Sequence, residues 1–203
     1  MVYRAAAYHT PLWIEPNVMA GRFNRRGEGP VQYFCEHPLG PLAEAVRRLP
    51  DGLDPAEIRR PVWALRLPDD TTVETVGFQD AADMGMEPYA LVSPPEGYGE
   101  CRQLGDRYLE QEQPPMLRVP SAALPGTWNL VVFGQRVLAP YALEPLDPLL
   151  DVPGAPAAVD ARALDELVGM VRPLDQIAHA AYDAWDSGRE YEFVEPQALS
   201  LGG

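Results

Sequence analysis

The predicted strands of this chain are short and are joined by irregular connections, a feature that limits its fold more than any other. Segments typical of strands occur at residues 3–7, 31–35, 60–67, 71–76, 116–119 and 129–133. The Pro68-Asp69-Asp70 turn between the third and fourth segments predicts that these two strands are neighbours. Because helices do not alternate regularly with the strands, the pattern predicts an α+β fold.

Two helices are predicted among these strands. One begins at His37-Pro38, where proline suits the first turn, and ends at Leu49, before Pro50-Asp51-Gly52. The other spans residues 99–110. Apolar residues recur at helical spacing in both segments: Leu39, Leu42, Val46 and Leu49 in the first, and Cys101, Leu104 and Tyr108 in the second. Each helix therefore has one face suited to a core.

The composition changes near residue 140, which predicts a division of the chain. Five prolines between Pro140 and Pro156 separate acidic residues and leucines, a pattern typical of an extended connector. Apolar residues then recur at steps of three and four from Leu164 to Trp185, with Pro173 breaking or kinking the helical region. We therefore predict a domain over residues 1–140, followed over 141–203 by a proline-rich acidic connector and a C-terminal amphipathic helical region.

Arginine supplies all 16 basic residues of the 203-residue chain, and this excludes several reaction types. Without lysine, no lysine Schiff base can form and no Walker lysine can bind a nucleotide. None of the four serines lies in a G-x-S-x-G elbow, and no G-x-G-x-x-G follows a strand. The three histidines lack metal-ligand spacing, so no metal site is predicted, and Cys35 and Cys101 are predicted to be reduced core thiols.

Charge is unevenly distributed along the chain. Residues 1–60 contain eight arginines and seven acidic residues, a net charge of +1, whereas residues 61–203 contain eight and 23, a net charge of −15. A phosphate-bearing ligand is therefore expected near the first third, and the overall acidity argues against direct nucleic-acid binding. No run of about 18 apolar residues and no signal peptide is present, so we predict a cytoplasmic protein without a membrane span.

Four short motifs follow one another in the first two thirds of the chain. They are Tyr3-Arg4, Gly21-Arg22-Phe23-Asn24, Tyr33 with Glu44 eleven positions later, and Val119-Pro120-Ser121 followed by Trp128-Asn129. Through these motifs the sequence resembles the RES-domain family, which is named for its arginine, glutamate and serine. The resemblance runs from Tyr3 to about Phe133.

The resemblance implies a single ADP-ribosyltransferase-like domain, here with a C-terminal helical extension, that acts as the toxin of a toxin–antitoxin pair. It implies that NAD is a substrate, not a cofactor, and that its nicotinamide–ribose bond is cleaved by a glycohydrolase or phosphorylase reaction. It also implies an Xre-like antitoxin partner that covers the active site. Whether the protein forms a homo-oligomer stays open.

The residue types at the motif positions suit this chemistry. Cleavage of the nicotinamide–ribose bond develops positive charge on the ribose, which a carboxylate such as Glu44 can stabilise. Arg4 and Arg22 can bind a diphosphate through their guanidinium groups. The predicted catalytic residues are Glu44 and Arg4, and the predicted NAD-binding residues are Arg4, Arg22, Tyr33, Ser121 and Asn129.

The last three of these residues have more specific expected contacts. Tyr33 offers a ring for stacking and a hydroxyl for a ribose. Ser121 can donate a hydrogen bond to a phosphate or ribose oxygen, and Asn129 can hold the Ser121 loop in shape.

Each site residue also has a structural interpretation. Glu44 lies four residues before Arg48, so the two can form an exposed helical ion pair of about 0.3–0.5 kcal/mol. Arg4 and Arg22 could also be ordinary surface arginines. Tyr33 can be a core aromatic residue, and the Ser121 hydroxyl can shape a turn.

Two alternative functions stay open as well. One is a protein ADP-ribosyltransferase, which differs only in the acceptor, and the other is a catalytically inactive partner-binding module. The sequence departs from the family pattern at Ala5, where a second aromatic is common, and at Phe23, where tryptophan is commoner. These departures concern substrate affinity and antitoxin pairing more than the class of reaction.

Overall fold

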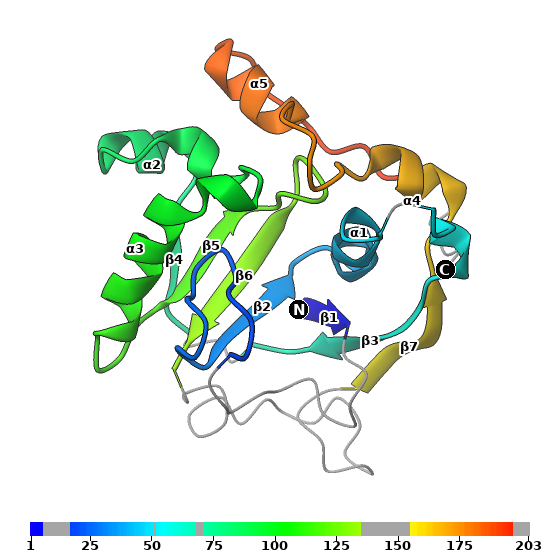
Figure 1. Ribbon diagram of the computed structural model, residues 1–203, viewed down its shortest axis with the longest axis horizontal. Helices are drawn as coiled ribbons and strands as arrows, with labels where there is room; N and C mark the ends of the chain where they lie inside the picture. The colour runs from blue at the N-terminus through cyan, green and yellow to red at the C-terminus, as the bar shows by residue number, and fades with distance from the viewer. Residues whose placement is uncertain (6–16, 51, 68–70, 135–154, 197–203) are drawn as a thin grey trace.

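The computed structural model describes residues 1–5, 17–50, 52–67, 71–134 and 155–196, and it is built on one mixed sheet (Figure 1). The sheet has seven strands in the order β4-β5-β6-β2-β1-β3-β7. These are β1 (Val2–Ala5), β2 (Val31–Cys35), β3 (Arg59–Leu65), β4 (Val73–Thr75), β5 (Met116–Pro120), β6 (Trp128–Phe133) and β7 (Ala155–Arg162). Neighbours pair antiparallel, except β4 and β5, which are parallel.

The helices are short and irregularly spaced between the strands. They are α1 (Gly40–Arg47), α2 (Phe78–Asp83), α3 (Gly99–Leu109), α4 (Asp165–Met170) and α5 (Ala180–Asp186), with 3-10 turns η1 (Pro55–Glu57), η2 (Pro88–Leu91) and η3 (Pro95–Gly97). The predicted α+β fold is confirmed. Within the ranges just given, no helix combines the length and the apolar character that crossing a membrane requires.

The predicted pairing of segments 60–67 and 71–76 is wrong. β3 lies between β1 and β7, whereas β4 forms the opposite edge of the sheet beside β5. A turn signal shows where a chain reverses, but hydrogen bonding to a buried partner decides where the next strand lies. β4 is exposed and pairs through Val73↔Met116 with the largely buried β5. The Pro68-Asp69-Asp70 turn itself lies outside the described residues.

Alternating side chains divide the sheet into two faces. Tyr33 and Cys35 of β2 lie on the face that α1 and α3 cover, which we call the helix face. On this face, Val131 packs with Leu104 of α3 in one core cluster. Phe34 points the other way, into a second cluster on the opposite face. Successive residues of a strand point to opposite faces, so only every second residue can contribute its side chain to a site on the helix face.

Helix α1 lies directly against β2. A Cβ atom on Gly40 would lie 2.5 Å from the Cβ of Cys35, so a larger residue could not begin the helix this close to the strand. Leu39 and Leu42 are buried in a third core cluster, as the apolar spacing predicts. This packing holds Glu44, one turn after Gly40, beside the end of β2.

The predicted helical region after residue 164 is broken at Pro173 into α4 and α5. Leu167 of α4 is buried with Leu42 of α1, so this part packs on the rest of the chain. Strand β7 was not predicted, and it pairs antiparallel with β3. The predicted connector at residues 140–156 lies almost wholly outside the described residues, and the domain division at residue 140 stays a prediction.

His179 gives the fold a pH dependence that can be measured. The ring is buried at the start of α5, where Nδ1 accepts a hydrogen bond from the Tyr182 N–H at 3.2 Å. Nε2 therefore bears the proton and donates to the Ser121 carbonyl at 3.0 Å. Burial lowers the pKa of His179 to about 4. The neutral ring is thus built into the folded state.

We expect the stabilising effect of neutral His179 to be complete above pH 6.5 and to be lost as the pH falls toward 4. In that range the unfolded state binds a proton that the folded state does not. The free energy of unfolding therefore falls by about 3 kcal/mol in total. Denaturant unfolding of wild type and His179→Asn measures this effect, because the asparagine oxygen can accept the hydrogen bond from the Tyr182 N–H in place of Nδ1 but does not titrate. Their difference in unfolding free energy should change by that amount between pH 7 and pH 4, and a constant difference would contradict the prediction.

Candidate functional site

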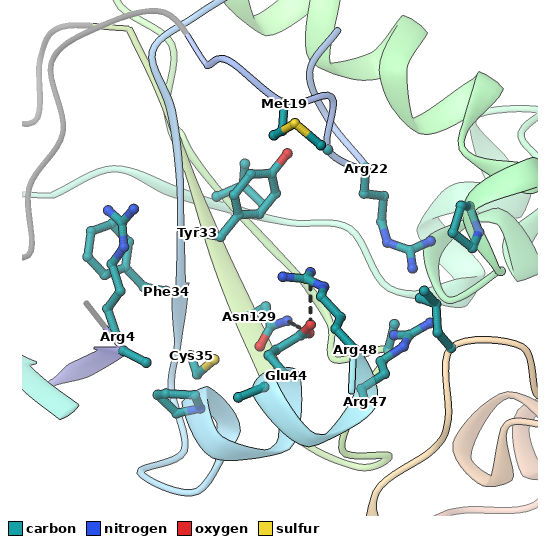
Figure 2. Close-up of a pocket in the computed structure, with 18 of the residues that line it drawn as sticks. Arg4, Met19, Arg22, Tyr33, Phe34, Cys35, Glu44, Arg47, Arg48 and Asn129 are labelled. Carbon is teal, nitrogen blue, oxygen red and sulfur yellow. Dashed lines mark hydrogen bonds and ion pairs between the residues drawn. The ribbon is translucent and has the colours of Figure 1, made fainter. Parts of the chain in front are cut away.

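A cavity of about 1010 Å³ opens on the helix face, between α1 and the segment around Gly21 (Figure 2). Its polar lining includes Arg22, Tyr33, Glu44, Arg47, Arg48 and Asn129. Pockets for small ligands usually have volumes of about 300–1,000 Å³. The cavity therefore has room for a ligand of dinucleotide size.

Glu44 is held in this cavity by one residue on each carboxylate oxygen (Figure 2). Oε1 accepts a hydrogen bond from Asn129 Nδ2 at 3.3 Å, and Oε2 lies 3.1 Å from Arg48 Nη2. The side chain of Glu44 is 20% exposed, whereas that of Arg48 is 66% exposed. The helical ion pair is thus present, and the carboxylate faces the cavity at the same time.

Asn129 has a different contact from the expected one. It was expected to hold the Ser121 loop, but its amide instead donates to Glu44. The reason is the register of the sheet, since Asn129 lies opposite Cys35 and so faces the side where α1 packs. Asn129 therefore orients the candidate catalytic carboxylate.

The hydroxyl of Tyr33 is used within the protein, and its ring lines the cavity. The hydroxyl donates to Asn24 Oδ1 at 2.7 Å and accepts from the Phe23 N–H at 3.0 Å. A Cβ atom on Gly21 would lie 2.5 Å from both Asn24 Oδ1 and the Tyr33 hydroxyl, so glycine is required there. Burial raises the pKa of the Tyr33 hydroxyl far above its usual range. The ring, not the hydroxyl, is available to a ligand.

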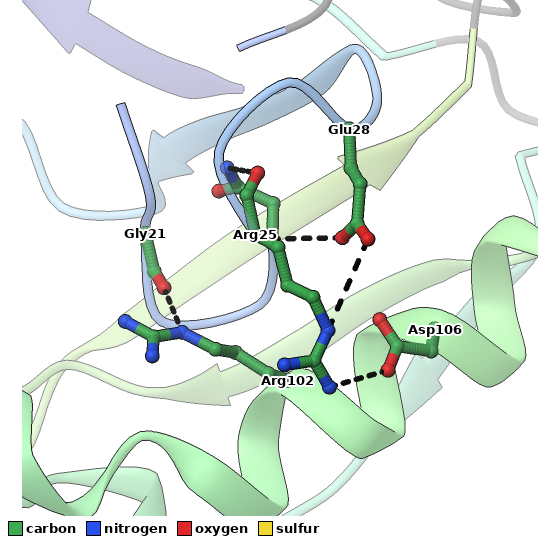
Figure 3. Close-up of polar contacts among 6 residues, drawn as sticks. Gly21, Arg25, Glu28, Arg102 and Asp106 are labelled. Carbon is green, nitrogen blue, oxygen red and sulfur yellow. Dashed lines mark hydrogen bonds and ion pairs between the residues drawn. The ribbon is translucent and has the colours of Figure 1, made fainter. Parts of the chain in front are cut away.

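Polar contacts fix the Gly21–Glu28 loop on α3 (Figure 3). Arg102 Nε donates to the Gly21 carbonyl at 3.1 Å, and Arg25 Nη2 lies 2.9 Å from Asp106 Oδ2. The Arg25 N–H also donates to Glu28 Oε2 at 3.0 Å. The loop that forms one wall of the cavity is therefore anchored to α3 at its start, Gly21, and at Arg25.

Arg22 borders the cavity, but its guanidinium binds protein groups. Nη1 donates to the Ala90 carbonyl at 2.8 Å and Nη2 to the Ser93 carbonyl at 2.9 Å. The guanidinium also lies over the Tyr98 ring, 4.3 Å from its centroid. Arg22 thus joins its loop to the η2–η3 segment, and its predicted role as a phosphate ligand would require it to exchange these bonds.

Arg4 lies on the opposite face of the sheet from Glu44 (Figure 2). Its Nη1 donates to Gln32 Oε1 at 2.7 Å, and its guanidinium lies 5.6 Å from the ring centroid of Phe34. Arg4 nevertheless lines the same cavity as Arg22 and Glu44. The structure thus places Arg4 and Glu44 on different faces of the sheet but in the lining of one cavity, and the roles assigned to Arg4 stay predictions.

Ser121 is buried and does not line the cavity. Its Oγ accepts a hydrogen bond from the Leu124 N–H at 3.2 Å, which closes the turn after β5. The Ser121 hydroxyl thus shapes a turn, which is the structural interpretation given for it in the sequence analysis. A contact between Ser121 and NAD stays a prediction that this arrangement does not favour.

Arg47 was missed by the sequence analysis although it lines the cavity. Its side chain belongs to the face of α1 that carries Gly40 and Ala43, seven and four positions earlier, and all three residues are buried. Two small residues before an arginine on one helix face indicate close packing, and this signal could have identified it. The leucines of the same helix mark a different face as the one that packs on the core.

The cavity lining also includes the thiol of Cys35 and the carboxylates of Asp54 and Glu57. Cys35 and Cys101 are free and buried, as predicted, and burial raises the pKa of Cys101 to about 11 and that of Cys35 well above its usual range. Both thiols are therefore protonated. No group of three or more His, Cys, Asp or Glu side chains among the described residues is placed to hold a metal ion.

Comparison with known proteins identifies the family. The family model described as the RES domain matches residues 1–153, three quarters of the chain. Three chains of solved structures match, including one from the M. tuberculosis MbcT-MbcA toxin-antitoxin complex, with a TM-score of 0.53 and 15% identity over 84% of this chain and 87% of that one. No curated protein matches. The chain has the fold of that structure, and it belongs to the RES domain family.

Proposed function

We propose that the protein is the toxin of a toxin–antitoxin pair and that it degrades NAD by cleaving the nicotinamide–ribose bond. The observation that carries this proposal is the Glu44 carboxylate, which Asn129 and Arg48 orient inside a cavity of about 1010 Å³. Membership of the RES domain family supports the same conclusion.

The chemistry requires little beyond such a carboxylate. As the C–N bond breaks, its electron pair leaves with nicotinamide as a neutral ring, so no strong general acid is needed. The ribose becomes oxocarbenium-like, and Glu44 stabilises that charge in the transition state. Water then attacks the anomeric carbon to give ADP-ribose and a proton, or phosphate attacks to give a phosphorylated ADP-ribose. The ring of Tyr33 is available to stack on a flat group of the substrate.

An antitoxin partner is part of this proposal, and apolar side chains at the cavity support it. Met19 and Leu53 line the cavity and are 75% and 56% exposed, and Val18, next to Met19 in the sequence, is 71% exposed. Exposed apolar side chains next to a polar site are typical of a protein interface. The matched structure is itself a toxin–antitoxin complex. We propose an Xre-like antitoxin that covers the cavity.

Product analysis of NAD incubated with the purified protein tests the proposal. We expect release of nicotinamide, with ADP-ribose formed in phosphate-free buffer and any phosphorylated product formed only when phosphate is present. A mock purification from cells that lack the gene controls for contaminating enzymes. The absence of turnover by folded protein in both buffers would contradict the proposal, and label from NAD on a macromolecule would instead indicate an ADP-ribosyltransferase.

A further inference from the structure

Arg47 is a buried cation with unfilled hydrogen-bond donors. Its relative exposure is 5%, and its Nε and Nη2 atoms have no hydrogen-bond partner among the described residues. Burying a charge without a partner costs several kcal/mol, so such groups are rare in folded proteins. Burial lowers the pKa of Arg47 to about 10, which still leaves it charged at neutral pH.

The two neighbouring arginines differ from Arg47 in this respect. Arg172 donates to the carbonyls of Val92, Ala178 and Ile177, and Arg22 donates to the carbonyls of Ala90 and Ser93. Both guanidinium groups are therefore held by backbone oxygens, as expected of arginines that support a fold. Arg47 has no such contacts, although it lies close enough to both for their charges to affect it.

The surroundings of Arg47 favour an anion. The charged groups that act electrostatically on Arg47 are one carboxylate, that of Glu44, and two guanidinium groups, those of Arg22 and Arg172. That carboxylate already accepts from Asn129 and pairs with Arg48. The local charge is positive in a chain whose net charge is −14. Figure 2 shows the guanidinium groups of Arg22 and Arg47 on the same side of the cavity.

We propose that Arg47 binds a phosphate group inside the cavity, through its free Nε and Nη2 donors. These two atoms form the fork that matches two oxygens of one phosphate. The phosphate is either part of the diphosphate of NAD or a free inorganic phosphate, and both sources have the same chemistry. The inference rests on the proposed function only for the first source. It assigns to Arg47 the role that the sequence analysis gave to Arg4 and Arg22.

A stability measurement separates a ligand-binding arginine from a structural one. In phosphate-free buffer, Arg47→Met should raise the melting temperature by about 2 °C or more, because the variant no longer buries an unpaired charge. Inorganic phosphate at constant ionic strength should stabilise wild type but not this variant. Arg107→Gln, an exposed arginine of α3 outside the cavity lining, is the control and should respond to phosphate as wild type does.

A binding measurement identifies the source of the phosphate. It uses Glu44→Gln as the background, to limit turnover, and adds Arg47→Gln, which also serves if Arg47→Met does not fold. If the diphosphate is bound, NAD affinity should fall about 10- to 100-fold, inorganic phosphate should compete with NAD, and binding of nicotinamide riboside, which lacks phosphate, should not change. If the site binds free phosphate instead, Arg47→Gln should abolish the binding of inorganic phosphate and leave NAD affinity unchanged.

Two results would overturn the inference. One is equal stabilisation by phosphate of wild type and Arg47→Met together with unchanged NAD affinity, and the other is a lower melting temperature of Arg47→Met without ligand. Neither readout depends on turnover. If wild type does not cleave NAD but its response to phosphate requires Arg47, the proposed function fails while the phosphate site stands.

Discussion

Glu44→Gln is expected to reduce the rate of nicotinamide release from NAD by about 10²- to 10³-fold or more. Glutamine has the same shape and can still accept the hydrogen bond from Asn129, but it carries no negative charge to stabilise the ribose. Its effect on folding should be small, because only the pair with the exposed Arg48 is lost. Nicotinamide release under saturating NAD, with far-UV circular dichroism of the same samples, measures both quantities.

Glu36→Gln is the matched control for this variant. Glu36 is also a partly exposed carboxylate paired with an arginine, since Arg118 Nε donates to it at 2.8 Å, but Glu36 does not line the cavity. Its loss should leave NAD cleavage near the wild-type rate. Equal rates for wild type and Glu44→Gln would show that Glu44 is not the catalytic carboxylate.

Local pattern was enough to predict most elements of the fold. The segment 31–35 is strand β2 with the predicted bounds, and the predicted helix at 99–110 is α3, with Cys101 and Leu104 buried. These elements are specified by residues close together in sequence, through apolar spacing and flanking turn residues. The pairing of β4 with β5 was not predictable in this way, because it joins residues 73–75 to residues 116–118.

The candidate site was predicted in part for the same reason. The order of the motifs identified Glu44 and Asn129 as candidate site residues. In the structure a hydrogen bond joins them, although they are 85 residues apart in the sequence. Sequence could not show that Arg4 occupies the alternate face of its strand relative to the helices, because the pairing register decides the face. Nor could it show that the guanidinium of Arg22 is occupied by carbonyls of residues 90 and 93.

Arg172→Met is expected to lower the free energy of unfolding by about 3–5 kcal/mol. Arg172 is 3% exposed, and its guanidinium donates to Val92 O, Ala178 O and Tyr89 Oη at 2.5, 2.7 and 2.9 Å. Methionine fills part of the space but leaves these buried oxygens without their charged donor. Equilibrium unfolding in urea, followed by tryptophan fluorescence and circular dichroism, measures the change.

The same variant should also loosen α5, because Arg172 joins the segment that precedes this helix to the body of the protein. Trp185 of α5 packs on Phe78 with ring centroids 5.7 Å apart, so its fluorescence reports whether the helix stays docked. Arg189→Met removes an exposed arginine just after α5 and serves as the control, with an expected change below about 0.5 kcal/mol. A loss under about 1 kcal/mol for Arg172→Met, with the Trp185 signal unchanged, would mean that its hydrogen bonds do not hold the C-terminal helices in place.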